Sequence, residues 1–147
     1  MMSEAQGQMH PRAALDRDLT HLKEELIRLG GQVDLAISRA MTALKERDLV
    51  LAEEVIVDDL KINARRYEIE EKSLSIIATQ QPAASDLRAI VAVLNMVSDL
   101  ERMGDHASGI ATLVTRMEDL AGLEMPTGLG AMAKMTRDML HAALDGY

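Results

Sequence analysis

Three long stretches of this sequence repeat their apolar residues at alternating spacings of three and four, and this pattern restricts the chain to packed helices. The clearest repeat consists of Leu15, Leu19, Leu22, Leu26, Leu29, Val33, Ala36, Ala40 and Ala43. It predicts a first helix over about residues 13–46. Gly30 and Gly31 interrupt the repeat, at a cost of roughly 1 kcal/mol per Gly relative to Ala, so we expect a kink or a close helix contact there.

Two more helices of similar length follow. The second is expected over about residues 48–79, with Asp48 as its N-cap. Its seam consists of Ile56, Leu60, Asn63, Tyr67, Glu70, Leu74 and Ile77, and is apolar except for Asn63 and Glu70. Pro82 ends it, and Ser85 is a candidate cap for the third helix over about 86–118. The third seam is Val93, Met96, Leu100, Met103, Ala107, Ile110 and Val114. Short connections between three such helices predict an all-α, up-down-up three-helix bundle, roughly 45 Å long and spanning residues 13–119.

A fourth, shorter helix is expected after the bundle. Gly122, Pro126, Gly128 and Gly130 mark a linker over residues 120–130. Residues from about 129 to 145 then place Met132, Met135, Met139 and Ala142 on one face. This helix has no remaining partner in the chain, so it packs on the bundle or on another subunit, or residues 131–147 begin a second unit that is truncated. An apolar helix face left in water favours dimerisation or a domain swap.

Composition excludes several classes of protein. Cysteine is absent, which removes disulfides and thiolate ligands. A net charge of −8 argues against sequence-independent nucleic-acid binding, which needs clustered Lys and Arg. The polar N-terminus has no hydrophobic signal core, and no apolar run approaches the roughly 20 residues of a membrane span. We therefore expect a cytoplasmic protein that does not itself span a membrane.

Two pairs of oxygen-bearing side chains indicate a cation site. Asp59 and Asn63, and likewise Glu101 and Asp105, are four residues apart and so share a helix face. Asp59 and Asp105 each lie 23 residues from Pro82, and Asn63 and Glu101 each lie 19 residues from it. An antiparallel hairpin therefore brings both pairs to one level. Such hard donors suit Mg²⁺, Mn²⁺, Ca²⁺ or iron better than a structural zinc site. The alternatives are a solvated face for Glu101 and Asp105, and a role for Asn63 in helix register.

The sequence lacks the common catalytic signatures. It has no P-loop, no His-Glu-x-x-His, no Gly-x-Ser-x-Gly and no Glu-x-x-His pair of the di-iron bundles. We therefore do not expect an enzyme.

Three stretches together resemble the PhoU family of phosphate-regulon regulators. They are Asp59-x-x-Ile62-Asn63 with Ile69-Glu70, then Gln81-Pro82-Ala83-Ala84-Ser85-Asp86-Leu87-Arg88, and then Asp99-Leu100-Glu101-Arg102-Met103-Gly104-Asp105-His106. The resemblance covers about residues 15–120. It implies one PhoU-like three-helix unit and the start of a second, in a family whose acidic motifs bind metal ions or clusters.

On that resemblance we expect a non-enzymatic adaptor between a phosphate ABC transporter ATPase and a sensor histidine kinase. It would repress phosphate-starvation signalling and phosphate uptake, and form a homo-oligomer. The family motif assigns Asp59, Asn63, Glu101 and Asp105 to a metal such as Mg, Mn, Fe or Zn. Asn63 stands where the motif has an acid, which weakens the expected affinity. Two alternatives remain: an oxygen-ligated metal-binding bundle with a storage or enzymatic role, and a purely structural oligomerising bundle.

Overall fold

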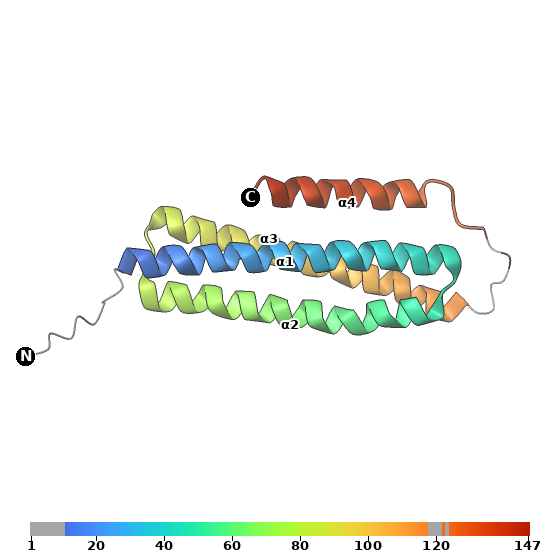
Figure 1. Ribbon diagram of the computed structural model, residues 1–147, viewed down its shortest axis with the longest axis horizontal. Coiled ribbons are helices and arrows are strands. Elements are labelled where there is room, and N and C mark those ends of the chain that lie inside the picture. Colours follow the sequence, from blue (N-terminus) through green and yellow to red (C-terminus); the bar gives the residue numbers. More distant parts are fainter. Residues whose placement is uncertain (1–10, 118–121, 123) are drawn as a thin grey trace, which may run out of the picture.

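The architecture is a bundle of three long antiparallel helices with a fourth, shorter helix laid along it (Figure 1). The computed structural model describes residues 11–117, 122 and 124–147. Within them the helices are α1 (Pro11–Glu46), α2 (Leu49–Gln80), α3 (Ala84–Arg116) and α4 (Leu129–Asp145), and no strand is present. The all-α bundle is confirmed. The expected bundle end at residue 119, part of the linker and the polar N-terminal segment 1–10 lie outside the described residues.

The core is an aliphatic seam shared by the three long helices. The predicted seam of α1 is confirmed, since all its members are buried except Leu19, which is partly buried and packs on the core. In α3 the predicted residues Val93, Leu100, Ala107 and Val114 are buried, while Met96, Met103 and Ile110 pack partly buried against them. Burial of this apolar surface is the main force that holds the bundle together.

The predicted seam of α2 is largely wrong, although its members Ile56 and Ile77 pack partly buried against the core. The true buried face consists of Ala52, Val55, Ile62, Ile69, Ser73 and Ile76. Leu60, Tyr67 and Leu74, which were assigned to the core, are more than half exposed. The error arises because α2 carries large apolar residues on two faces, and the predicted seam lies one residue, about 100°, away from the buried one. Asn63 is consequently partly buried beside the core instead of lying in it.

Of the three predicted helix boundaries, at Asp48, Pro82 and Ser85, the first two are confirmed. Asp48 caps α2 as predicted, because its Oδ1 accepts a hydrogen bond from the Leu51 amide at 3.0 Å. Gln81, before Pro82, ends α2 in the left-handed region with φ of 45°. Ser85 is not a cap: α3 begins after Ala83, without a side-chain cap, and Ser85 lies in its first turn.

α4 packs along α1, and among the described helices its backbone comes close only to that one. Leu140 is its buried residue, and Leu144 lies so close to Gly30 that a Cβ at that position would collide with it. The expected close contact at Gly30 is thus observed, while α1 runs unbroken through both glycines. The predicted methionine face is exposed at Met132, Met135 and Met139, and Met139 also borders a hollow beside α3.

No helix among the described residues is both long and apolar enough to cross a membrane.

Candidate functional site

The predicted acidic pairs meet where α2 crosses Gly104 of α3. Asp59 Oδ1 and Ile62 Cγ2 lie 3.5 Å and 3.3 Å from the position that a Cβ on Gly104 would occupy. The missing side chain at Gly104 therefore allows α2 and α3 to approach closely at the level of Asp59. In α3, Asp105 directly follows Gly104 and Glu101 precedes it by three residues.

The electrostatics of Asp59 show that it shares one site with both acids of α3. Burial raises the pKa of Asp59, and repulsion from Asp105 and then Glu101 raises it further. Asp59 thus faces Glu101 and Asp105 from across the helix interface, as the hairpin geometry predicted. Among the described residues, no basic side chain forms an ion pair with Asp59.

Arg66 is the residue of this site that the sequence analysis missed. Its Nη1 donates a hydrogen bond to Glu101 Oε2 at 3.1 Å and lies 3.9 Å from Glu70 Oε1. Burial opposes the charge of Arg66, but Glu101 and Glu70 raise its pKa on balance. Arg66 lies seven residues after Asp59, so the two side chains are on the same side of α2. This spacing could have indicated that Arg66 belongs to the site. The guanidinium group of Arg66 therefore already pairs with Glu101.

The donor set partly fits a metal ion. Asp59 Oδ1 and Asn63 Oδ1 are buried and accept no hydrogen bond from any described residue, so both oxygens are available to a hard cation. Against this, no group of three His, Asp or Glu side chains within the described part of the chain is placed to hold a metal ion. Arg66 already neutralises Glu101. Asp59, Asn63 and Asp105 are the residues that remain to hold a cation, as an open site with few protein ligands.

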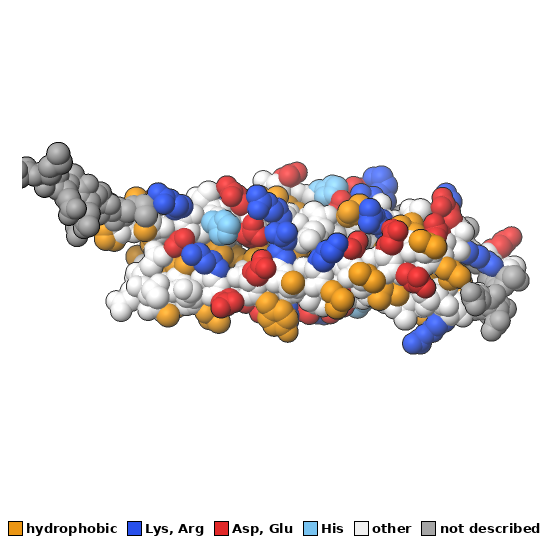
Figure 2. Space-filling view, turned by 60° about the horizontal axis from the view of Figure 1, so that its bottom comes forward, with side chains coloured by type: hydrophobic (Ala, Val, Ile, Leu, Met, Phe, Trp, Pro, Cys, Tyr) orange, Lys and Arg blue, Asp and Glu red, His pale blue; other side chains and the backbone are white. Residues whose placement is uncertain are grey.

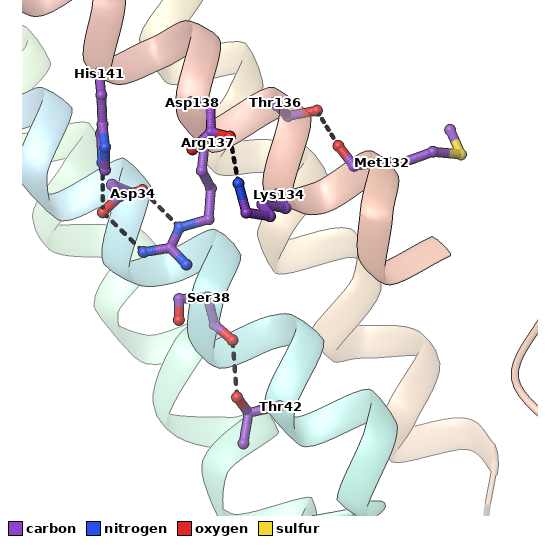
Figure 3. Close-up of polar contacts among 9 residues, drawn as sticks. All are labelled: Asp34, Ser38, Thr42, Met132, Lys134, Thr136, Arg137, Asp138 and His141. Carbon is purple, nitrogen blue, oxygen red and sulfur yellow. Dashed lines mark hydrogen bonds and ion pairs between the residues drawn. The ribbon is translucent and has the colours of Figure 1, made fainter. Parts of the chain in front are cut away.

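A second polar cluster, also missed, fastens α4 to α1 (Figure 3). Asp34 of α1 accepts hydrogen bonds from Arg137 Nε at 2.8 Å and Nη2 at 3.3 Å, and His141 Nε2 lies 3.1 Å from its Oδ2. The hydrogen bond from Arg137 lowers the pKa of Asp34, burial opposes this, and His141 lowers it further. Because these residues are more than 100 positions apart, no local spacing could have indicated the cluster.

The fold and the site together define the class of protein: an all-α unit of three long antiparallel helices, with acidic residues of α2 and α3 facing each other at one level. A family model described as the PhoU domain matches residues 26–114. The chain belongs to the PhoU family, so the resemblance seen in the sequence motifs is confirmed.

Relatives with curated names agree with this assignment. The chain is 33% identical over 140 residues to the "Phosphate-specific transport system accessory protein PhoU" of Edwardsiella tarda, and 32% identical over 140 residues to the protein of that name from Escherichia coli. Each alignment covers 94% of this chain and 57% of the relative. The chain thus spans little more than half the length of these relatives.

A solved structure has the same fold. The crystal structure of the phosphate transport system regulatory protein PhoU from Streptococcus pneumoniae superimposes with a TM-score of 0.83 at 33% identity. The superposition covers 90% of this chain and 62% of that one.

Proposed function

We propose that this chain is a regulatory unit of phosphate transport that represses phosphate-starvation signalling and phosphate uptake. The observation that carries the proposal is the match of 94% of the chain to proteins named as phosphate-specific transport system accessory proteins. In this proposal the chain acts in the cytoplasm as a non-enzymatic adaptor between the ATPase of a phosphate ABC transporter and a sensor histidine kinase.

The proposal is tested by complementation and by direct binding. The full chain is expressed in a bacterium that lacks its own phosphate-transport accessory protein, and alkaline phosphatase is measured as a starvation reporter in phosphate-rich medium. We expect repression of the reporter, and binding of the purified chain to the transporter ATPase and to the cytoplasmic part of the kinase. If the chain is stably expressed but neither represses the reporter nor binds either protein, the proposal is wrong.

A cation held by Asp59, Asn63 and Asp105, beside the Glu101 that Arg66 already pairs, is a second proposal, and a metal-storing or metal-dependent bundle is the alternative function that goes with it. It is supported by the two buried oxygens of Asp59 and Asn63 that lack a donor. The bound ion, Mg²⁺, Mn²⁺, iron or Zn²⁺, would offset the repulsion among the three carboxylates.

The cation proposal is tested on chelated protein. Addition of Mn²⁺ should raise the melting temperature of the native chain, and Asp59→Asn combined with Asp105→Asn should abolish the rise. Asp99→Asn, on the exposed side of α3, is the matched control and should leave the rise intact. An equal rise in all three proteins would show non-specific binding.

We also propose that the exposed methionines of α4 join two copies of the chain. Met139 borders a hollow of about 340 Å³ between α3 and α4, whose lining includes Met96 and Met103. Burial of this apolar surface would favour a homodimer. Met135→Lys with Met139→Lys should convert a dimer to a monomer in light scattering, whereas Leu113→Lys, on exposed α3 surface, should not.

A further inference from the structure

A separate apolar stripe runs along the outward face of α2. Its large members are Val50, Val57, Leu60, Tyr67 and Leu74, each between 57% and 69% exposed. With Ala64 they follow steps of three, four and seven residues, so they stay on one side of the helix over about 36 Å. Figure 2 shows the face on which α2 comes forward, with hydrophobic side chains spaced along it among acidic ones.

The stripe does not contribute to the bundle core. The core face of α2 lies on the opposite side and includes Ile62, Ile69 and Ile76. The helix therefore carries large apolar residues on both sides, and those of the stripe are exposed to solvent. A row of large apolar side chains exposed on one helix face is a candidate interaction site, and steps of three, four and seven residues are the pattern that accepts another helix.

The charges around the stripe specify the partner. All four basic side chains of α2 are already paired with acids: Lys61 with Asp58, Arg65 with Glu25, Arg66 with Glu101 and Glu70, and Lys72 with Asp18. In contrast Glu53, Glu54, Glu68 and Glu71 are exposed and make no ion pair or hydrogen bond with the described residues. The stripe is thus bordered by negative charges that lack a counter-charge.

A shallow hollow at the N-terminal end of α2 shows how a basic residue would fit. The hollow has a volume of about 420 Å³ and is lined by Arg39, Val50, Glu53, Glu54, Val57 and Asp58. The aliphatic stem of a Lys or Arg side chain would cover the two valines, while its charged head reaches Glu53 or Glu54. Arg39 is already engaged by Asp58, at 3.4 Å.

We propose that the outward face of α2 is a docking surface for a positively charged amphipathic helix of a partner protein. This surface is distinct from the acidic site and from the methionine face of α4, and the inference does not depend on the proposed function. A second copy of α2 would set like charges against each other, and the same glutamates repel an anionic membrane. A basic helix instead satisfies both the apolar stripe and the unpaired glutamates.

The test uses the full chain and three synthetic peptides of 25 residues. The first carries Leu at three-and-four spacing with Lys on both flanks. The second replaces each Lys by Glu, and the third replaces each Leu by Ser. We expect only the first to bind with appreciable affinity, and its Kd to rise with added salt because exposed charges are screened. Equal binding of the second or third peptide would overturn the proposal.

Matched variants locate the binding face. Leu60→Gln with Leu74→Gln, and separately Glu53→Gln with Glu71→Gln, should each raise the Kd of the first peptide at least tenfold, which corresponds to about 1.4 kcal/mol. The control pairs are Leu35→Gln with Leu113→Gln, and Glu24→Gln with Glu46→Gln, on exposed parts of α1 and α3. These should change the Kd by less than about twofold. If the control pairs weaken binding as much as the α2 pairs, net charge alone attracts the peptide and the proposal fails.

Discussion

We predict that Leu140→Ala detaches α4 while the three-helix bundle stays folded. Leu140 is 5% exposed and is the one residue of α4 that is buried in the described structure. The remaining attachment includes Leu144 against Gly30, the polar cluster at Asp34, and Tyr147, whose hydroxyl donates a hydrogen bond to the Ala89 carbonyl of α3 at 3.4 Å. Because the backbone of α4 comes close only to that of α1, release of α4 leaves the packing among α1, α2 and α3 in place.

The magnitude follows from these contacts. Truncation of a buried Leu to Ala costs about 2–5 kcal/mol, and we take about 2–3 kcal/mol because α4 lies at the edge of the core. The ion pairs at Asp34 are partly exposed and contribute up to about 1 kcal/mol each. A released helix of 17 residues is only marginally stable in water, so it unfolds when it leaves α1.

Hydrogen exchange read by mass spectrometry measures this release directly. A loss of about 2–3 kcal/mol should accelerate exchange of residues 129–145 by roughly 30- to 150-fold, at about 1.4 kcal/mol per factor of ten. Peptides from α2 should keep their protection. Asp145→Ala, an exposed position of the same helix, is the control and should change exchange very little. Unchanged exchange in α4, or equal loss of protection in α2, would refute the reasoning.

Three further predictions concern single side chains. Because the pKa of Asp59 is raised in the folded state, its carboxyl group favours folding fully below its ordinary pKa, and this stability is lost as the pH rises through the folded value. Asp59→Asn should therefore raise the melting temperature of metal-free protein by about 1–3 °C at pH 7 and not at about pH 3. The pKa of Asp34 is lowered in the folded state, so its stabilisation of the α4 attachment is complete above the ordinary pKa and is lost as the pH falls through the folded value. Amide hydrogen exchange of α4, corrected for intrinsic rates, should therefore speed up in acid. Asp34→Asn should show the faster exchange already at pH 7. Asp48→Ala should lower the free energy of unfolding in urea by about 1 kcal/mol through loss of the α2 cap, whereas Ser85→Ala should change it by less than about 0.5 kcal/mol.

Periodicity predicted α1 and α3 well because each has one apolar face. The apolar residues of α1 recur without a competing set, so their burial could be read directly from their spacing. α2 has two apolar faces with large residues on each: Leu60, Tyr67 and Leu74 lie outside, while Ile62, Ile69 and Ile76 occupy the interior. Spacing alone cannot decide which of two such faces packs inward.

The candidate site was predicted in its position but not in its charge balance. Counting residues from Pro82 placed Asp59 level with Asp105, which agrees with the electrostatic coupling of these two side chains. The reach of Arg66 to Glu101 depends on side-chain conformation, which residue numbers do not contain. The docking of α4 depends on contacts such as that between Arg137 and Asp34, which are 103 residues apart, and no local sequence pattern predicts it. Binding of a cation at this site stays a prediction.

The contact between Gly30 and Leu144 links two positions that lie 114 residues apart in the sequence. A side chain at position 30 would require Leu144 to change its conformation, a smaller residue at position 144, or a shift of α4 along α1. These two positions should therefore vary together across relatives that keep this arrangement. Covariation of positions 30 and 144 would identify, from sequences alone, the members of the family in which the fourth helix packs against the first.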